Sequence, residues 1–181
     1  MNRPFEDLPP LPRAGSADWL FIRRDDDGTP VYVDVAGALR VAERVVRVWV
    51  KYVPPKEGAA RREAEKYLTE TGNDGARLAY VLQPWELNLE TDQAADLGIV
   101  FSDDGDRVIA AIRFQEPTRR DCEAGTLQAA LRAAVNGIWR QDKLGADPVL
   151  HERLAQTLKE LNRAFEEFET CEGEGPSPSR K

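Results

Sequence analysis

The sequence contains few of the residues from which catalytic and metal sites are usually built. Its 181 residues include one histidine, two cysteines and one methionine. A hydrolytic triad needs a nucleophile, a base and an orienting acid, whereas the only histidine, His151, lies on a predicted packing seam. The chain also lacks a glycine-rich phosphate loop and a dinucleotide-binding fingerprint. We therefore expect a protein that is not an enzyme and that has no cofactor and no metal site.

Long apolar runs and clusters of basic residues are also absent. No stretch approaches the roughly 20 apolar residues that a membrane-spanning helix needs. Lysine and arginine total 25 against 32 acidic residues, which gives a formal net charge of −7. Because nucleic-acid affinity comes mainly from basic side chains that release counterions, we expect no nucleic-acid binding. The start of the chain carries acids and prolines where a secretory signal carries an apolar run, so we expect an intracellular protein or one whose signal was removed.

What is present is the composition of a globular protein, with 41% apolar and 31% charged residues. Four prolines fall within residues 1–16, and proline blocks helix and sheet hydrogen bonding, so this stretch is predicted to be a disordered lead-in. Residues 172–181 form a second tail by the same reasoning. Between the tails we expect a sheet domain over 17–144 and an amphipathic helix over 145–171 that packs on this domain or extends it.

Period-two alternation of apolar and polar residues predicts six strands joined by short connections. Turns rich in Asp and Gly follow two of them, and a proline within the fourth implies a bulge or an edge position. We therefore expect an α+β fold with a roughly six-stranded antiparallel sheet packed with helices, plus a C-terminal helical hairpin. The predicted strands are 19–24, 31–35, 44–53, 76–90, 97–102 and 107–114.

Apolar residues in steps of three and four predict helices over 57–71, 123–143 and 148–170. The last helix carries a seam of nearly three heptads. We favour packing of this seam against its own chain, because short seams are usually intramolecular, and homodimerisation is the alternative. The seam consists of His151, Leu154, Leu158, Leu161, Phe165 and Phe168.

The two cysteines bracket the predicted helical hairpin. Cys122 precedes the helix over 123–143, and Cys171 follows the helix over 148–170. Since about equal lengths of chain lie on either side of Gly145, an antiparallel hairpin would bring the two thiols near each other. A disulfide is one hypothesis, and two free thiols in a reducing cytoplasm are the alternative.

Acidic residues cluster at 25–27 and at 103–106, which invites comparison with calcium loops. Neither cluster has the alternate acid spacing and the closing glutamate of such a loop. Asp and Gly tolerate turn conformations, so turn chemistry explains both clusters. Asp34 and Glu86 could form a catalytic carboxylate pair, but any acidic protein offers such pairs by chance.

The strand over 44–53 places Arg47, Trp49 and Lys51 on one face and valines on the other. A tryptophan between two cations could form an exposed protein-binding surface, and Glu86 is a possible ion partner for it. We favour the alternative that a helix covers Trp49 and that the cationic side chains pack around it.

Four segments follow one another in the order WLFIRRDDDGTPVYVDVAGAL, VVRVWVKY, PWELNLETD and FSDDGDRVI. Their order and spacing resemble the surface-adhesin protein E family of bacteria, over roughly residues 19–139. The resemblance implies an antiparallel sheet packed with helices, and an exported protein that adheres to host matrix or serum proteins. Family members commonly carry a cysteine where this chain has Leu89, bonded to another near the end of the helix. The region 135–137 offers no cysteine, so this disulfide is absent.

These observations together lead to two hypotheses of function. The first is a non-enzymatic binding or adhesion-type module with a protein partner of unknown identity. The second is an intracellular assembly or scaffolding protein that dimerises through the C-terminal helix. The sequence does not name the partner.

Overall fold

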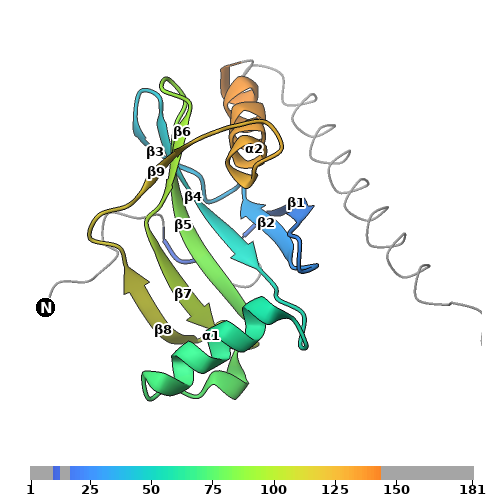
Figure 1. Ribbon diagram of the computed structural model, residues 1–181. Helices are drawn as coiled ribbons and strands as arrows, with labels where there is room; N and C mark the ends of the chain where they lie inside the picture. Colours follow the sequence, from blue (N-terminus) through green and yellow to red (C-terminus); the bar gives the residue numbers. More distant parts are fainter. Residues whose placement is uncertain (1–9, 13–16, 144–181) are drawn as a thin grey trace, which may run out of the picture. The chain divides into compact units, whose positions relative to one another are not determined.

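The computed structural model describes residues 10–12 and 17–143 of the chain. They form an antiparallel sheet with two α-helices packed against it, which confirms the predicted α+β class (Figure 1). The strands are β1 (Trp19–Arg24), β2 (Pro30–Asp34), β3 (Leu39–Ala42), β4 (Val45–Tyr52), β5 (Tyr80–Asn88), β6 (Gln93–Asp96), β7 (Gly98–Ser102), β8 (Val108–Arg113) and β9 (Arg119–Asp121). The helices are α1 (Ala59–Glu70), the short 3₁₀-helix η1 (Gly75–Arg77) and α2 (Leu127–Lys143).

The sheet has nine strands, so the prediction of about six strands was too low. The three additional strands, β3, β6 and β9, contain only three or four residues each. Alternation cannot be recognised over so few positions, which is why the sequence pattern missed them. The predicted strand over 76–90 also starts later, at Tyr80, because the preceding residues form η1, whose Ala76 N–H donates to the Asp74 side chain.

Strand β5 is the point at which the sheet divides. Strands β1, β2, β4 and β5 are hydrogen-bonded in that order, and beyond β5 the first half of the strand pairs with β7 and the second half with β6. The division falls opposite Pro84, which has no N–H to donate, and its carbonyl accepts from Leu97 N–H at 2.7 Å. Strands β8 and β9 continue the two arms from β7 and β6, respectively.

Both helices cover the same face of the sheet, α1 at one end and α2 at the other (Figure 1). Under α2, Leu131 and Val135 pack on the valines of β2 and β4, and each of these two side chains is at most 1% exposed. Under α1, Leu68 packs on Leu78 and Phe101. This face therefore contains two apolar clusters, one beneath each helix.

The opposite face carries a third apolar cluster that is built around Trp49. Period-two alternation places Trp49 between Arg47 and Lys51 on this face, while Val48 and Val50 point toward the helices. The described side chains that pack with Trp49 come mainly from β5, β6, β7 and the adjoining turns. The faces predicted for the strand over 44–53 agree with this arrangement.

Glycines limit α1 on its C-terminal side. The helix ends before Gly72, whose φ of +79° is a conformation that favours glycine. Gly75 then passes so close to the helix that an added Cβ would lie 2.6 Å from the Glu65 carbonyl oxygen. This contact fixes α1 against the segment that leads into β5.

The predicted helix over 148–170, with its seam from His151 to Phe168, lies outside the described residues, and so does Cys171. The C-terminal hairpin, the dimer seam and the disulfide therefore stay predictions. Helix α2 begins at Leu127 rather than at 123, because a turn with Gly125 at φ +83° precedes it. No helix of the described part of the chain is long and apolar enough to cross a membrane.

Candidate binding pocket

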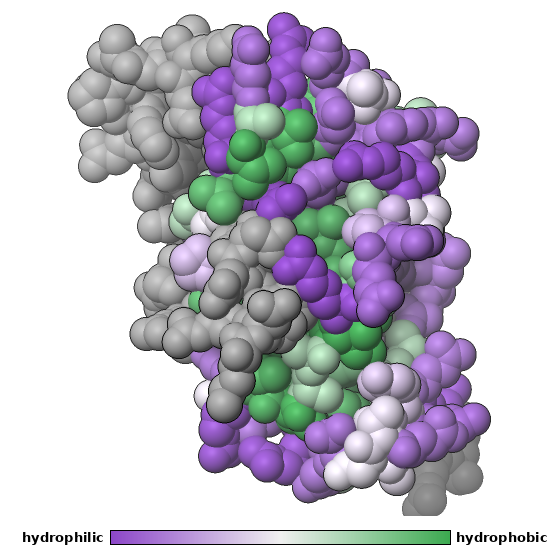
Figure 2. Space-filling model, turned by 90° about the vertical axis from the view of Figure 1, so that its left-hand side faces the viewer, coloured by the Kyte–Doolittle hydropathy of each residue, from purple (hydrophilic) through white to green (hydrophobic). Residues whose placement is uncertain are grey.

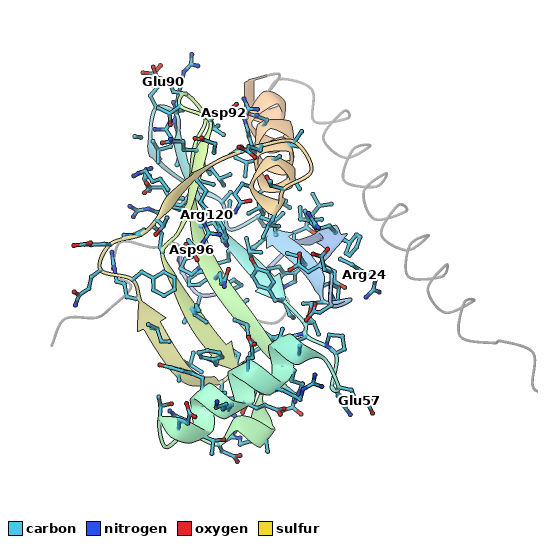
Figure 3. All side chains as sticks on the ribbon, in the orientation of Figure 1. Arg24, Glu57, Glu90, Asp92, Asp96 and Arg120 are labelled. Atoms are coloured by element: carbon cyan, nitrogen blue, oxygen red, sulfur yellow. The ribbon has the colours of Figure 1, made fainter. Side chains whose placement is uncertain are left out.

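An open pocket of about 800 Å³ lies on the helix-covered face, between α1 and the turn that joins β1 to β2. Its size falls in the range of sites that hold a small molecule or a few side chains of a partner. Arg24 in the β1–β2 hairpin and Glu57 just before α1 mark the two elements on either side of it (Figure 3). The lining residues are Arg23, Asp25, Asp26, Asp27, Thr29, Tyr52, Pro54, Ala60, Glu63, Ala64, Tyr67, Val81, Gln83, Ile99, Phe101 and Ile112.

The floor of the pocket is apolar and is formed by the strands of the sheet beneath α1. Val81, Ile99 and Ile112 come from β5, β7 and β8, and all three are only half-buried. Residues at the centre of a helix-covered sheet are usually fully buried. These three retain exposed surface because they lie on the open pocket that α1 leaves beside them.

Helix α1 forms one side of the pocket. Ala60, Ala64 and Tyr67 follow the spacing of one helix face, and small alanines leave room beside the sheet. Tyr67 is 38% exposed and its ring stacks on Phe101, with 5.6 Å between ring centroids. The stacked pair supplies a flat aromatic surface at one end of the floor.

The β1–β2 turn forms the other side, and it is acidic. Burial raises the pKa of Asp25, and the neighbouring Asp27 and Asp26 carboxylates raise it further, while Arg23 at 3.6 Å lowers it. The pKa of Asp27 is lowered, first by the nearby Thr29 hydroxyl and then by backbone N–H groups that include Ala60. Asp27 thus lies toward the positive N-terminal turn of α1, where a carboxylate is stabilised.

Two polar side chains lie at the back of the pocket. Gln83 accepts a hydrogen bond from the Trp85 indole N–H at 3.2 Å. Burial raises the pKa of the Tyr52 hydroxyl well above its ordinary value. These groups can donate or accept hydrogen bonds, but they do not provide a charge.

The sequence predicted a binding surface on the face opposite the pocket. Its residues, Arg47, Trp49, Lys51 and Glu86, are buried or bound by other side chains of the chain. Trp49 is fully buried, at 0% exposure, and Glu86 is 8% exposed. Arg47 donates to Glu86 Oε2 from Nε at 3.1 Å and from a terminal nitrogen at 2.9 Å, and Arg119 donates to Oε1 at 2.9 Å. Partner binding at these residues stays a prediction, and it requires this cluster to open.

Lys51 is held by aromatic rings on the same face. Its Nζ lies 4.2 Å from the Tyr80 ring centroid and 5.4 Å from that of Trp19. Burial lowers the pKa of Lys51, and Asp106 opposes this shift. Burial, followed by the hydrogen bond to Asp106 at 2.6 Å, raises the pKa of Tyr80. Each cation of the predicted surface therefore has a partner within the chain.

The two acidic clusters differ in their role. Asp103 is 1% exposed, and backbone N–H donation by Arg107, together with the Arg77 side chain and Gly105 N–H, lowers its pKa to about 2. It organises a turn, as expected from turn chemistry. The 25–27 cluster also forms a turn, but it lines the pocket, which sequence reasoning missed. Within the described part of the chain, no group of three or more His, Cys, Asp or Glu side chains is placed to hold a metal ion.

Two other residues that the sequence singled out, Asp34 and Cys122, do not line the pocket. Asp34 accepts hydrogen bonds from the backbone N–H groups of Asp18 and Gly37, so its carboxylate organises the start of β1 and the turn after β2. Cys122 is half-buried against the cluster beneath α2, and burial raises the pKa of its thiol. A buried thiol with a raised pKa is a weaker nucleophile than a free one at neutral pH.

The fold and the pocket define an α+β protein with an antiparallel sheet and an open, acid-rimmed apolar pocket. No family model, curated protein or solved structure matches the chain. The resemblance to the surface-adhesin protein E family therefore stays a prediction.

Proposed function

We propose that the chain is a non-enzymatic module that binds a protein partner through the pocket between α1 and the β1–β2 turn. The observation that carries this proposal is the pocket itself, an open space of about 800 Å³ above an apolar floor. Exposed apolar surface in a concave site is typical of places where a partner inserts a side chain.

The chemistry of the lining supports binding over catalysis. The lining residues include no histidine, cysteine, serine or lysine, so a nucleophile paired with an imidazole base is absent from the pocket. The resemblance to an adhesin family also supports a binding role, although it does not point to this site. The rival hypothesis, dimerisation through the seam from His151 to Phe168, concerns residues outside the described part.

The proposal can be tested by selecting phage-displayed random peptides on the immobilised full-length chain. We expect enriched peptides that bind the wild type and lose binding to Ala60→Trp, because an indole at this exposed lining position fills the pocket. Ala59→Trp is the matched control, since Ala59 is the exposed neighbour in α1 that does not line the pocket. Peptides that bind both variants equally, or no enrichment at all, would contradict the proposal.

A further inference from the structure

The rim of the pocket carries an excess of negative charge. Four of the lining residues are acidic, namely Asp25, Asp26, Asp27 and Glu63, and Arg23 is the one basic lining residue. Arg23 lies 3.6 Å from the Asp25 carboxylate, and its guanidinium also donates to the Gly125 carbonyl at 2.9 Å and to the Arg24 carbonyl at 3.2 Å. The rim therefore carries three more acidic than basic side chains.

The carboxylates of the turn are also crowded. Asp25 is half-buried, and its pKa is raised by burial and, to a smaller extent, by the two like charges beside it, while Arg23 lowers it. A cation placed at this rim would be attracted by the carboxylates of the turn. Thr29 on the same wall is 3% exposed, and its hydroxyl lies near Asp27, whose pKa it lowers.

The floor sets a second requirement on the ligand. The side chains of Val81, Ile99 and Ile112 offer only apolar atoms, and removing apolar surface from water favours binding. A small hydrated cation would leave this floor uncovered, whereas a large apolar side chain would cover it. A single ligand satisfies both parts only if it joins an apolar group to a positive charge.

Charge also distinguishes the possible occupants. Residues 144–181 of the chain itself contain five basic and eight acidic residues, so their net charge has the same sign as the rim. We infer that the occupant is a segment of another protein in which a large apolar side chain is flanked by lysine or arginine. This inference rests on the proposed function, because it assumes that the pocket binds a protein.

The test uses three hexapeptides titrated into the full-length chain and followed by NMR amide shifts. GKFLKG joins apolar and basic residues, GEFLEG reverses the charge, and GKSGKG keeps the charge but removes the apolar pair. We expect GKFLKG to bind at least about tenfold more tightly than either control, since opposite charges attract across the rim and the floor needs an apolar group. Shifts should centre on Val81 and Ile99, and the affinity should fall about threefold or more from about 50 to about 500 mM salt.

Two double variants, each of which removes two carboxylates, test whether the carboxylates of the rim attract the peptide. The double variant Asp26→Asn/Glu63→Gln removes two exposed rim charges and should weaken GKFLKG binding about fivefold or more. The control Glu70→Gln/Asp104→Asn removes two exposed charges that do not line the pocket, and it should leave the affinity within about twofold. If both double variants lose the same affinity for GKFLKG, the attraction comes from the net charge of the chain and not from the rim, and the inference is overturned.

The remaining outcomes separate this inference from the proposed function. Pocket-dependent peptides without basic residues, or GEFLEG binding as tightly as GKFLKG, would overturn the inference and leave the proposed function standing. Phenethylammonium binding as tightly as GKFLKG would assign the pocket to small organic cations and overturn the choice of a protein segment. If neither GKFLKG nor any selected peptide binds at the pocket, both the inference and the proposed function fail.

Discussion

The two faces of the sheet differ in how their charged side chains are paired. On the face around Trp49, the buried Glu86 is bound by Arg47 and Arg119, and Lys51 lies against aromatic rings. On the helix-covered face, α1 and α2 each bury an apolar cluster, and an open pocket with an acidic rim lies beside α1. Paired charges close one surface, whereas an excess of acidic side chains beside exposed apolar atoms leaves the other available to a ligand.

The edges of the sheet form an intermediate case. Leu39 and Val41 in β3 and Val108 in β8 are the large apolar side chains of the strands that are most exposed, at 39%, 40% and 48%. Figure 2 shows apolar surface bordered by hydrophilic side chains on the side where these two strands lie. These positions offer apolar contacts but lack the concave shape of the pocket.

The largest expected effect on stability comes from Glu86→Gln, on the face of the sheet that contains Trp49. The change removes the anion that both Arg47 and Arg119 bind, so the largely buried Arg47 guanidinium loses its charged partner. We expect a loss of about 3 kcal/mol in the free energy of unfolding, measured by urea denaturation. A loss below about 0.5 kcal/mol, typical of a surface site, would show that the network does not stabilise this face.

A smaller loss is expected when α1 is forced away from the chain that leads into β5. Gly75→Ala places a Cβ 2.6 Å from the Glu65 carbonyl oxygen, and backbone cannot move aside as easily as a side chain. We expect a destabilisation of about 1–3 kcal/mol, the usual cost of an added methyl group in a tight contact. Gly137→Ala is the control, because an added Cβ there meets nothing within 4 Å.

Acid should reveal the contribution of Asp103. Because its pKa in the folded chain is about 2, against 3.8 ordinarily, the carboxylate stabilises the fold fully above about pH 4. That stabilisation is lost as the pH falls toward 2, where the folded chain also takes up the proton. Asp103→Asn should therefore lower Tm at pH 5 and bring the two melting temperatures closer at pH 2. A Tm difference that stays constant over this range would contradict the assignment.

The smallest expected effect on stability comes from Asp26→Asn, on the helix-covered face of the sheet. Asp26→Asn also removes a carboxylate, but this exposed residue lies on the rim of the open pocket. We expect the free energy of unfolding to change by less than about 0.5 kcal/mol in urea denaturation. A loss comparable to that of Glu86→Gln would mean that the rim is a structural element rather than a ligand surface.

The parts of the fold that the sequence predicts well are those with long local patterns. The alternation of 44–53 correctly separated Val48 from Trp49, and the apolar spacing of 57–71 located α1 within two residues at its N-terminus and one at its C-terminus. The pocket could not be predicted in this way, because Asp25 and Glu63 line it together only through the packing of α1 beside the β1–β2 turn. For the same reason, the Arg47–Glu86 pair depends on the register of β4 and β5, which periodicity does not specify.

The division of the sheet opposite Pro84 has a consequence for how the molecule opens. Strand β5 is shared by two arms of the sheet, namely β7 and β8, which lie under α1, and β6 and β9, whereas α2 packs mainly on β2 and β4. Since few backbone hydrogen bonds tie one arm to the other, thermal fluctuations can loosen each arm as a separate cooperative unit. We expect native-state hydrogen exchange to report two classes of slow amides, one for each arm, with the β5 amides among the slowest of both.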